Sequence, residues 1–285
     1  MSDGLLDIFR FGFMQRALIA GLVVATVCGL LGVFVVLRRT APLGDALAHV
    51  AFGGVALGIA AGLLPVEIAI LVAVLGGLGI RFLQDRHLYG ELSLTVVQAA
   101  GLGGGVVLLS LRGGLGVDIL SFLFGQILTV TWSDVAVMVG LLAATALVLV
   151  SLYKEYFLLT FDQEGARVGG LPVRALDTGF TILTAITVVL AMQVVGILLV
   201  SALLAVPAAT ALQLRLGLRG TLVASIFIGL LSVTAGLLLA IFLDAAPGGM
   251  IVLVCIAALL TSLAMAGRSK RVEPERRKVR ATNPR

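Results

Sequence analysis

The stretch from Ala17 to Leu37 contains no charged residue and no proline. A helix needs about 20 mostly apolar residues to cross the hydrocarbon core of a bilayer. This run is too long for the apolar core of a cleavable signal peptide. We therefore expect it to stay in the protein as a transmembrane helix.

The same pattern recurs along the chain, which is 60% hydrophobic and 12% charged, with a mean hydropathy of +1.17. Soluble domains carry about 25% charged residues, so the bilayer must be the solvent of this chain. One apolar run, 119–130, is too short to span and is expected to re-enter the membrane or lie at its surface. The pattern predicts an all-α, polytopic transmembrane bundle of about nine spans (eight to ten). The predicted spans are 17–37, 43–64, 66–83, 92–111, 135–152, 175–195, 197–214, 221–243 and 250–266.

Positive charge is concentrated at the C-terminal end. Residues 268–285 contain eight Lys or Arg and two Glu, so this tail accounts for the net charge of +5. Such a tail is typical of a cytoplasmic segment near anionic lipid, and we expect no nucleic-acid partner. Lys and Arg in alternate connections predict a cytoplasmic C-terminus in the inner (plasma) membrane. The expected division is an extracytoplasmic or interfacial segment (1–16), a transmembrane domain (17–267) and the basic tail (268–285).

Asp45 and His49 interrupt the second predicted span. Their i, i+4 spacing places both on one helix face, and ionisable residues within spans are candidates for function because they are costly there. A carboxylate and an imidazole together suit Zn²⁺, Mn²⁺ or Fe²⁺. Two ligands make a weak site, which suits transient binding. The alternative is structural, with Asp45 capping the helix and His49 packing against it.

Other polar or unusual residues in the apolar regions carry weaker signals. Glu67 and Asp118 flank the predicted outer side, where they attract cations or are simply solvated. Asp177, near the start of the sixth predicted span, is expected to be a helix-end charge. Pro207 leaves the carbonyl of Leu203 without its helical partner and predicts a kink.

Enzymatic chemistry is not indicated by the sequence. The glycines at 101, 103, 104 and 105 lie within a predicted span and lack the Lys-Ser/Thr that ends a phosphate-binding loop, so helix packing explains them better. No Walker A sequence, HExxH or Ser–His–Asp set is present. The energy source must be a separate ATPase or an ion gradient.

A polar connection at 154–174 separates the fifth and sixth predicted spans. Its central part, FDQEGARVGGLPV (161–173), ends in Gly-Gly and Pro172. A short surface helix here would present Asp162, Glu164 and Arg167 to a partner. By itself the pattern indicates only a cytoplasmic loop.

Five sequence features, taken in order, resemble the metal-ion ABC transporter permeases, which import zinc, manganese or iron. Together they extend over about residues 15–265. They are LRRTAPLGDALAHVAFGGVALG (37–58), GVDILSFLFGQIL (116–128), FDQEGARVGGLPV (161–173), VGILLVSALLAVPAATA (195–211) and the outer turn with Asp244, Pro247 and Gly248.

The resemblance implies a type II ABC importer fold and a homodimer served by two ATPase subunits and an extracytoplasmic metal-binding protein. It implies no permanently bound cofactor, only a transient divalent metal ion. Asp45 and His49 fall on the family's Asp-x-x-x-His positions, which are linked to cation coordination. Gln126 departs from the Asp that relatives often carry after Leu-Phe-Gly. The resemblance assigns coupling to the ATPase to Phe161, Asp162, Glu164, Ala166, Gly169 and Gly170, and gating or the pathway to Asp118, Phe124, Gly125 and Pro207.

Three other functions compete with this interpretation. A gradient-driven secondary transporter or channel would need no docking segment. A permease for iron chelates or cobalamin shares the architecture but is usually longer and lacks the Asp-x-x-x-His pair. A membrane enzyme would need the catalytic set that the sequence lacks.

Overall fold

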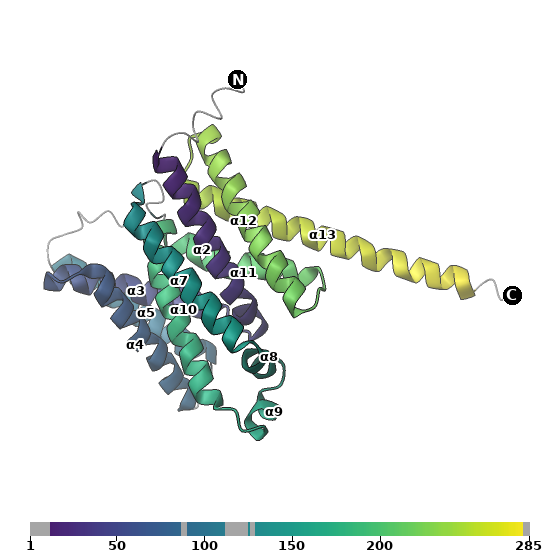
Figure 1. The fold of residues 1–285 in the computed structure, drawn as a ribbon, viewed down its shortest axis with the longest axis horizontal. Coiled ribbons are helices and arrows are strands. Elements are labelled where there is room, and N and C mark those ends of the chain that lie inside the picture. Colours follow the sequence, from purple (N-terminus) through teal and green to yellow (C-terminus); the bar gives the residue numbers. More distant parts are fainter. Residues whose placement is uncertain (1–11, 87–89, 112–124, 126–128, 282–285) are drawn as a thin grey trace.

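The computed structural model describes residues 12–86, 90–111, 125 and 129–281, with side chains up to Met265. Within these residues the regular structure is helical throughout (Figure 1). The helices are α2 (Gly12–Leu37), α3 (Pro42–Ala61), α4 (Pro65–Asp85), α5 (Gly90–Leu111), α7 (Trp132–Ser151), α8 (Tyr153–Phe161), α9 (Gln163–Val168), α10 (Val173–Val195), α11 (Ile197–Gln213), α12 (Leu218–Leu243) and α13 (Pro247–Ala281).

The prediction of an all-α bundle with about nine spans is confirmed. Eight helices in the described part of the chain are long and apolar enough to cross a membrane, and α11 is a shorter apolar helix. Several boundaries differ from the predicted ones. Helix α2 already begins at Gly12, α3 ends at Ala61 because Gly62 adopts the left-handed conformation (φ 69°), and α13 continues into the basic tail as far as Ala281.

Three helices form the interior of the bundle. Helices α2, α3 and α10 bury most of their apolar stretches, whereas α4, α5 and α13 leave most of theirs exposed, as expected of helices that face lipid. Helix α3 packs against α4 and α5, α2 packs against α11 and α12, and α10 packs against α4. The later part of α13 projects away from the bundle (Figure 1).

Glycines allow α3 and α5 to approach closely. A Cβ at Gly53 would overlap the backbone of Gly101, and one at Gly101 would lie 2.6 Å from the Cα of Val50. Gly105 lies against Gly53 in the same interface, whereas Gly103 has open space around it. Helix packing therefore explains Gly101 and Gly105, and this contact brings the polar residues of α5 next to α3.

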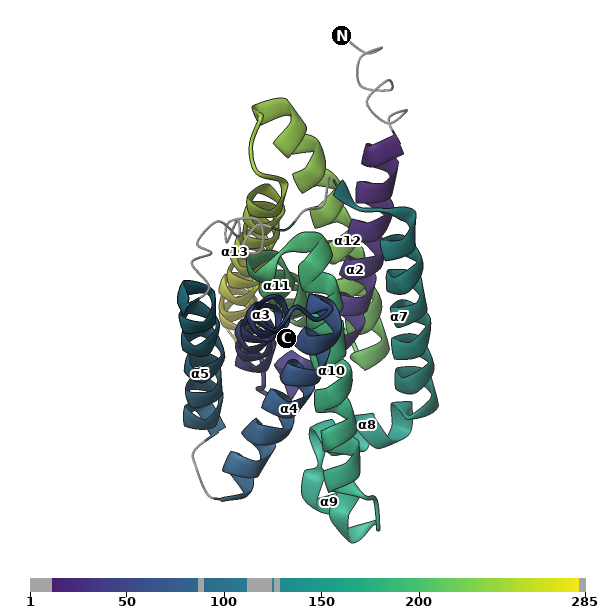
Figure 2. The same cartoon turned by 90° about the vertical axis from the view of Figure 1, so that its left-hand side faces the viewer.

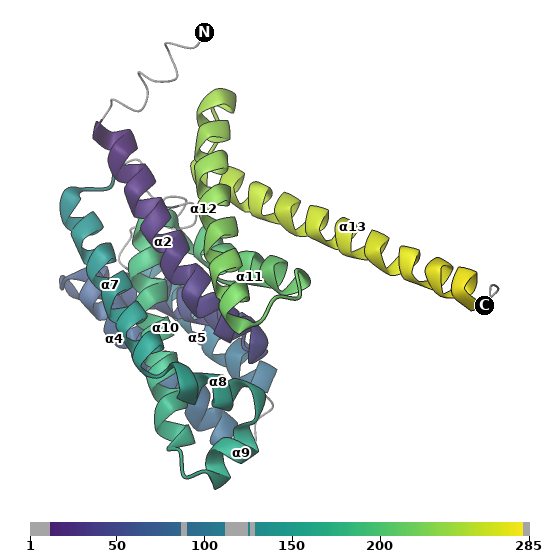
Figure 3. The same ribbon diagram turned by 45° about the vertical axis from the view of Figure 1, so that its right-hand side comes forward.

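The predicted polar connection contains two short helices. Helices α8 and α9 lie together at one end of the bundle, beside the end of α7 and the start of α10 (Figures 2 and 3). The turn between α2 and α3 lies close to them, since Phe34 of α2 contacts Tyr156 of α8 with ring centroids 6.1 Å apart. The 161–173 segment and the start of α3 therefore lie at the same end of the bundle.

Candidate functional site

Asp45 lies in the first turn of α3 and His49 one turn later, on the same face. Two neighbouring helices supply hydrogen-bond donors to the carboxylate. The side-chain amide of Gln98 in α5 donates to Asp45 Oδ2 (3.0 Å), and the hydroxyl of Ser201 in α11 donates to Asp45 Oδ1 (3.2 Å). Three helices therefore converge on one polar cluster, formed by Asp45, His49, Gln98 and Ser201.

The contacts of His49 indicate which ring nitrogen carries the proton. Its Nδ1 lies 2.9 Å from the backbone oxygen of Asp45, 3.3 Å from Gln98 Nε2 and 3.7 Å from Asp45 Oδ1. A carbonyl oxygen only accepts hydrogen bonds, so the shortest contact assigns the proton to Nδ1. The lone pair of Nε2 is then available to a metal ion, and a bond from Nδ1–H to a backbone carbonyl is the usual way of orienting a metal-binding histidine.

The cluster is open on one side. The side chain of Asp45 is 45% exposed and that of His49 is 21% exposed. Among the described residues, no group of three or more His, Cys, Asp or Glu side chains is placed to hold a metal ion. One copy of the chain therefore offers one carboxylate and one imidazole, a donor pair suited to a divalent transition metal but too small for a closed site.

The predicted pathway residues lie apart from this pair in the sequence. Pro207 is buried within α11. Gly125 (φ 76°) lies against the break between α10 and α11, where a Cβ would overlap Val195 and Gly196. Asp118 and Phe124 lie outside the described residues.

The 161–173 segment contains a capped surface helix, as its sequence suggests. Phe161 ends α8, and the carboxylate of Asp162 accepts a hydrogen bond from the backbone N–H of Gly165 (2.8 Å) at the start of α9. Ala166 is buried, whereas Val168 is 90% exposed. The remaining predicted coupling residues, Glu164, Gly169 and Gly170, are exposed.

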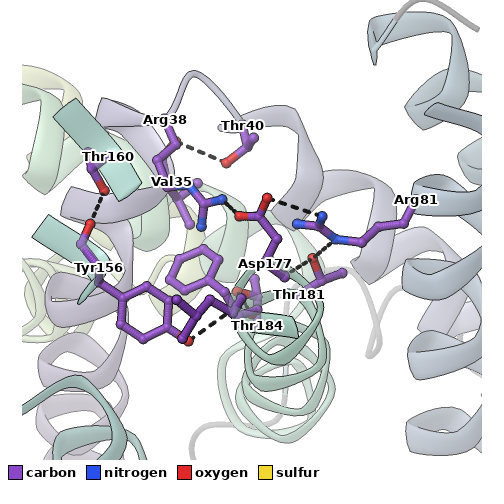
Figure 4. A network of polar contacts seen from close by, with 11 residues as sticks. Val35, Arg38, Thr40, Arg81, Tyr156, Thr160, Asp177, Thr181 and Thr184 are labelled. Carbon is purple, nitrogen blue, oxygen red and sulfur yellow. Dashed lines mark hydrogen bonds and ion pairs between the residues drawn. The ribbon is translucent and has the colours of Figure 1, made fainter. Parts of the chain in front are cut away.

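A second polar cluster joins three elements at the same end of the bundle (Figure 4). Asp177 of α10 forms ion pairs with Arg38, in the turn between α2 and α3, and with Arg81 of α4 (Nη1 to Oδ2, 3.4 Å). Arg81 Nε also donates to Thr181 Oγ1 (2.9 Å), one turn further along α10. The side chain of Asp177 is only 10% exposed. The prediction of a helix-end charge is wrong, because this carboxylate is buried between two guanidinium groups.

Arg38 also contacts aromatic rings. Its guanidinium lies 5.0 Å from the centroid of Phe180, which packs against Tyr156. Burial, together with the charge of Arg81, lowers the pKa of Arg38 to about 10, so this side chain is still protonated at neutral pH. Burial raises the pKa of the Tyr156 hydroxyl, which donates to the backbone oxygen of Leu176 (3.3 Å).

A cavity of about 480 Å³ adjoins the second cluster. Arg38, Arg81 and Asp177 form part of its wall, and Phe161 and Gln163 of the 161–173 segment form another part. The ion pairs therefore border a polar space shared with α9, not a fully packed core.

Comparison with known proteins decides the family. Residues 10–266 match the ABC 3 transport family. The chain belongs to this family. It is 35% identical over 260 residues to a probable metal transport system membrane protein of Treponema pallidum, covering 90% of this chain and 96% of that protein. It is 32% identical to the manganese transport system membrane protein MntC of Halalkalibacterium halodurans, covering 87% and 85%.

A solved structure agrees with this ABC 3 assignment. A chain of PsaBC from Streptococcus pneumoniae in complex with Fab superimposes with a TM-score of 0.83 at 30% identity, covering 92% of this chain and 95% of that chain. The predicted membership of the metal-ion ABC permeases and the type II importer-like fold are confirmed. The ABC 3 chain is thus a multi-pass membrane protein of a metal-transport family.

Several polar residues of this ABC 3 chain were not predicted as partners. Gln98 and Ser201 are uncharged residues within predicted spans, and only the packing of α5 and α11 on α3 reveals their contacts. Asp177 carried a usable signal, because an ionisable residue in a span is expected to have a partner. Its partners Arg38 and Arg81 are distant in sequence, so that signal did not identify them.

Proposed function

We propose that this chain is the permease subunit of an ATP-driven importer of divalent transition-metal ions, and that the ion passes beside Asp45 and His49. The observation that carries the proposal is the convergence of Asp45, His49, Gln98 and Ser201 from three helices of an otherwise apolar bundle. Polar groups are costly inside a membrane and are retained where an ion or a proton passes. Membership of the ABC 3 transport family supports the same function.

A second copy of the chain would complete the site. A carboxylate that faces lipid is costly, yet Asp45 is 45% exposed in the single chain. A homodimer that covers this face would remove that cost and bring together two carboxylates and two imidazoles. Four such ligands suit Zn²⁺, Mn²⁺ and Fe²⁺ alike, so the choice of ion depends on surrounding residues and on the delivering protein.

Energy would come from separate subunits. In this proposal two ABC ATPases dock on the 161–173 segments of the dimer, and an extracytoplasmic binding protein delivers the metal to the opposite side. ATP-driven closure of the ATPases would switch the access of the Asp45–His49 pairs from outside to inside. The permease would hold no permanent cofactor and would hydrolyse nothing itself.

Metal accumulation tests this function. The chain is reconstituted with its ATPase and binding protein in proteoliposomes, and uptake of Zn²⁺, Mn²⁺ and Fe²⁺ is measured in parallel with and without ATP. We expect ATP-dependent accumulation of at least one ion, abolished by Asp45→Ala and by His49→Ala while ATPase binding is kept. Glu91→Ala, which removes an exposed carboxylate in the first turn of α5, is the matched control and should transport normally. Uptake at the wild-type rate by either site variant, or uptake that needs no ATP, would contradict the proposal.

A further inference from the structure

The Arg38–Asp177–Arg81 cluster lies between the two functional regions of the chain. On one side, the hydroxyl of Tyr156 in α8 bonds to the carbonyl of Leu176, the residue before Asp177. Helix α8 is separated from α9 only by Asp162. A displacement of the 161–173 segment therefore reaches the carboxylate of Asp177 through directly bonded or packed groups.

On the other side, the cluster is linked to the start of α3. Only residues 39–41 separate Arg38 from this helix. The intervening turn is tight: Arg39 adopts φ 56°, the N–H of Thr40 bonds to the Val35 carbonyl (2.9 Å), and the Thr40 carbonyl accepts from Leu43 (2.9 Å). A turn fixed in this way passes a movement of Arg38 on to the first turn of α3, which carries Asp45.

Separating the ion pairs of this cluster would be costly in free energy. A buried carboxylate with two guanidinium partners keeps its geometry strictly, because losing either partner leaves a charge unpaired at low dielectric. Densely packed interiors resist small displacements. Here the ion pairs border the cavity shared with Phe161 and Gln163, so the cluster has room to move as a unit when α9 moves.

We propose that Asp177, held by Arg38 and Arg81, is a positioning residue that transmits displacement of the 161–173 segment to α3 and its Asp45–His49 pair. The inference rests on the proposed function, because it assumes that an ATPase moves this segment. In this proposal the buried ion cluster couples ATP hydrolysis to transport, although it contacts neither the metal nor ATP.

The test measures metal accumulated and phosphate released in the same proteoliposomes, containing the full complex, with Mn²⁺, Zn²⁺ and Fe²⁺ in parallel. Asp177→Asn removes the charge of the carboxylate at nearly constant size. Arg81→Gln removes one of its two partners, the one whose side chain is more exposed than that of Arg38 and is therefore more tolerant of change. Glu91→Gln, an exposed carboxylate-to-amide change in the first turn of α5, is the matched control.

We expect Asp177→Asn to hydrolyse ATP at close to the wild-type rate while the metal moved per ATP falls about tenfold, a usual size for coupling between sites. Arg81→Gln should show a smaller loss of the same ratio, and Glu91→Gln none. The wild-type measurement decides the proposed function, and the ratio in the variants decides this inference. An unchanged ratio in Asp177→Asn and Arg81→Gln would overturn it. A parallel loss of hydrolysis and transport with a lower melting temperature would also overturn it, since that result assigns the cluster a structural role only.

Discussion

The side-chain amide of Gln98 donates to Asp45 Oδ2 across the interface of α5 and α3 at 3.0 Å. This bond leaves Oδ1 to Ser201 and fixes the plane of the carboxylate beside His49. Gln98 also lies one turn from Gly101, whose backbone lies close to Val50 and Gly53 of α3. The geometry of the proposed ion site therefore depends on the packing of two helices as much as on the Asp45–His49 pair.

Replacing Gln98 by alanine tests this dependence. Groups that orient metal ligands typically change metal affinity by about 10- to 100-fold when they are removed. We expect Gln98→Ala to raise the KM for metal uptake about tenfold, at the lower end of that range, and to leave the protein folded. Thr95→Val is the control, because the hydroxyl of Thr95 is exposed and donates to the Glu91 carbonyl of its own helix. Equal KM values in the two variants would show that the amide does not orient the carboxylate.

The α3–α5 glycine contact gives a prediction on stability. In Gly53→Ala the added methyl would overlap the backbone of Gly101, and overpacking of this kind costs about 1–3 kcal/mol. We expect a lower melting temperature in detergent, together with weaker metal uptake because Gln98 moves with α5. Gly103→Ala, in the facing helix α5, is the control: its methyl meets open space, and the higher helix propensity of alanine adds up to about 1 kcal/mol. A melting temperature for Gly53→Ala that equals or exceeds that of Gly103→Ala would contradict the prediction.

The contact of Gly125 with the α10–α11 break gives a second stability prediction. Gly125 and Gly170 both have positive φ, 76° and 81°, but only Gly125 lacks room for a Cβ. Alanine at Gly170 should cost only the backbone strain, about 1 kcal/mol. Alanine at Gly125 should cost that strain plus displacement of Val195 and Gly196, and so lower the melting temperature further. Equal losses in the two variants, measured by thermal unfolding in detergent, would show that the close approach is unimportant.

Much of the fold follows from the sequence because apolar runs of spanning length have few alternatives in a bilayer. The shared face of Asp45 and His49 follows from helical spacing alone, and the surface helix at 161–173 follows from its polar residues and the Gly-Gly pair. The contacts of Gln98 and Ser201 do not follow, because apolar composition does not specify which helices become neighbours. Asp177 shows the same limit: its position in a span requires a partner, but Arg38 and Arg81 become its partners only through the packing of α4 and the α2–α3 turn against α10.

The exposed apolar side chain of Val168 gives a final prediction on the ATPase interface. Val168 is the last residue of α9 and is 90% exposed, and Phe161, the last residue of α8, is 59% exposed. Exposed apolar groups beside polar ones are typical of a contact surface, and burying a valine there contributes about 1.5 kcal/mol or more. In Val168→Arg we expect ATPase binding to weaken about tenfold, the change that about 1.4 kcal/mol produces, with no loss of thermal stability because the Val168 side chain is largely exposed. Leu214→Arg, at an exposed apolar position in the α11–α12 connection, is the matched control. If Leu214→Arg weakens ATPase binding as much as Val168→Arg does, added positive charge rather than loss of a specific contact explains the effect, and the 161–173 segment loses its assignment as the docking site.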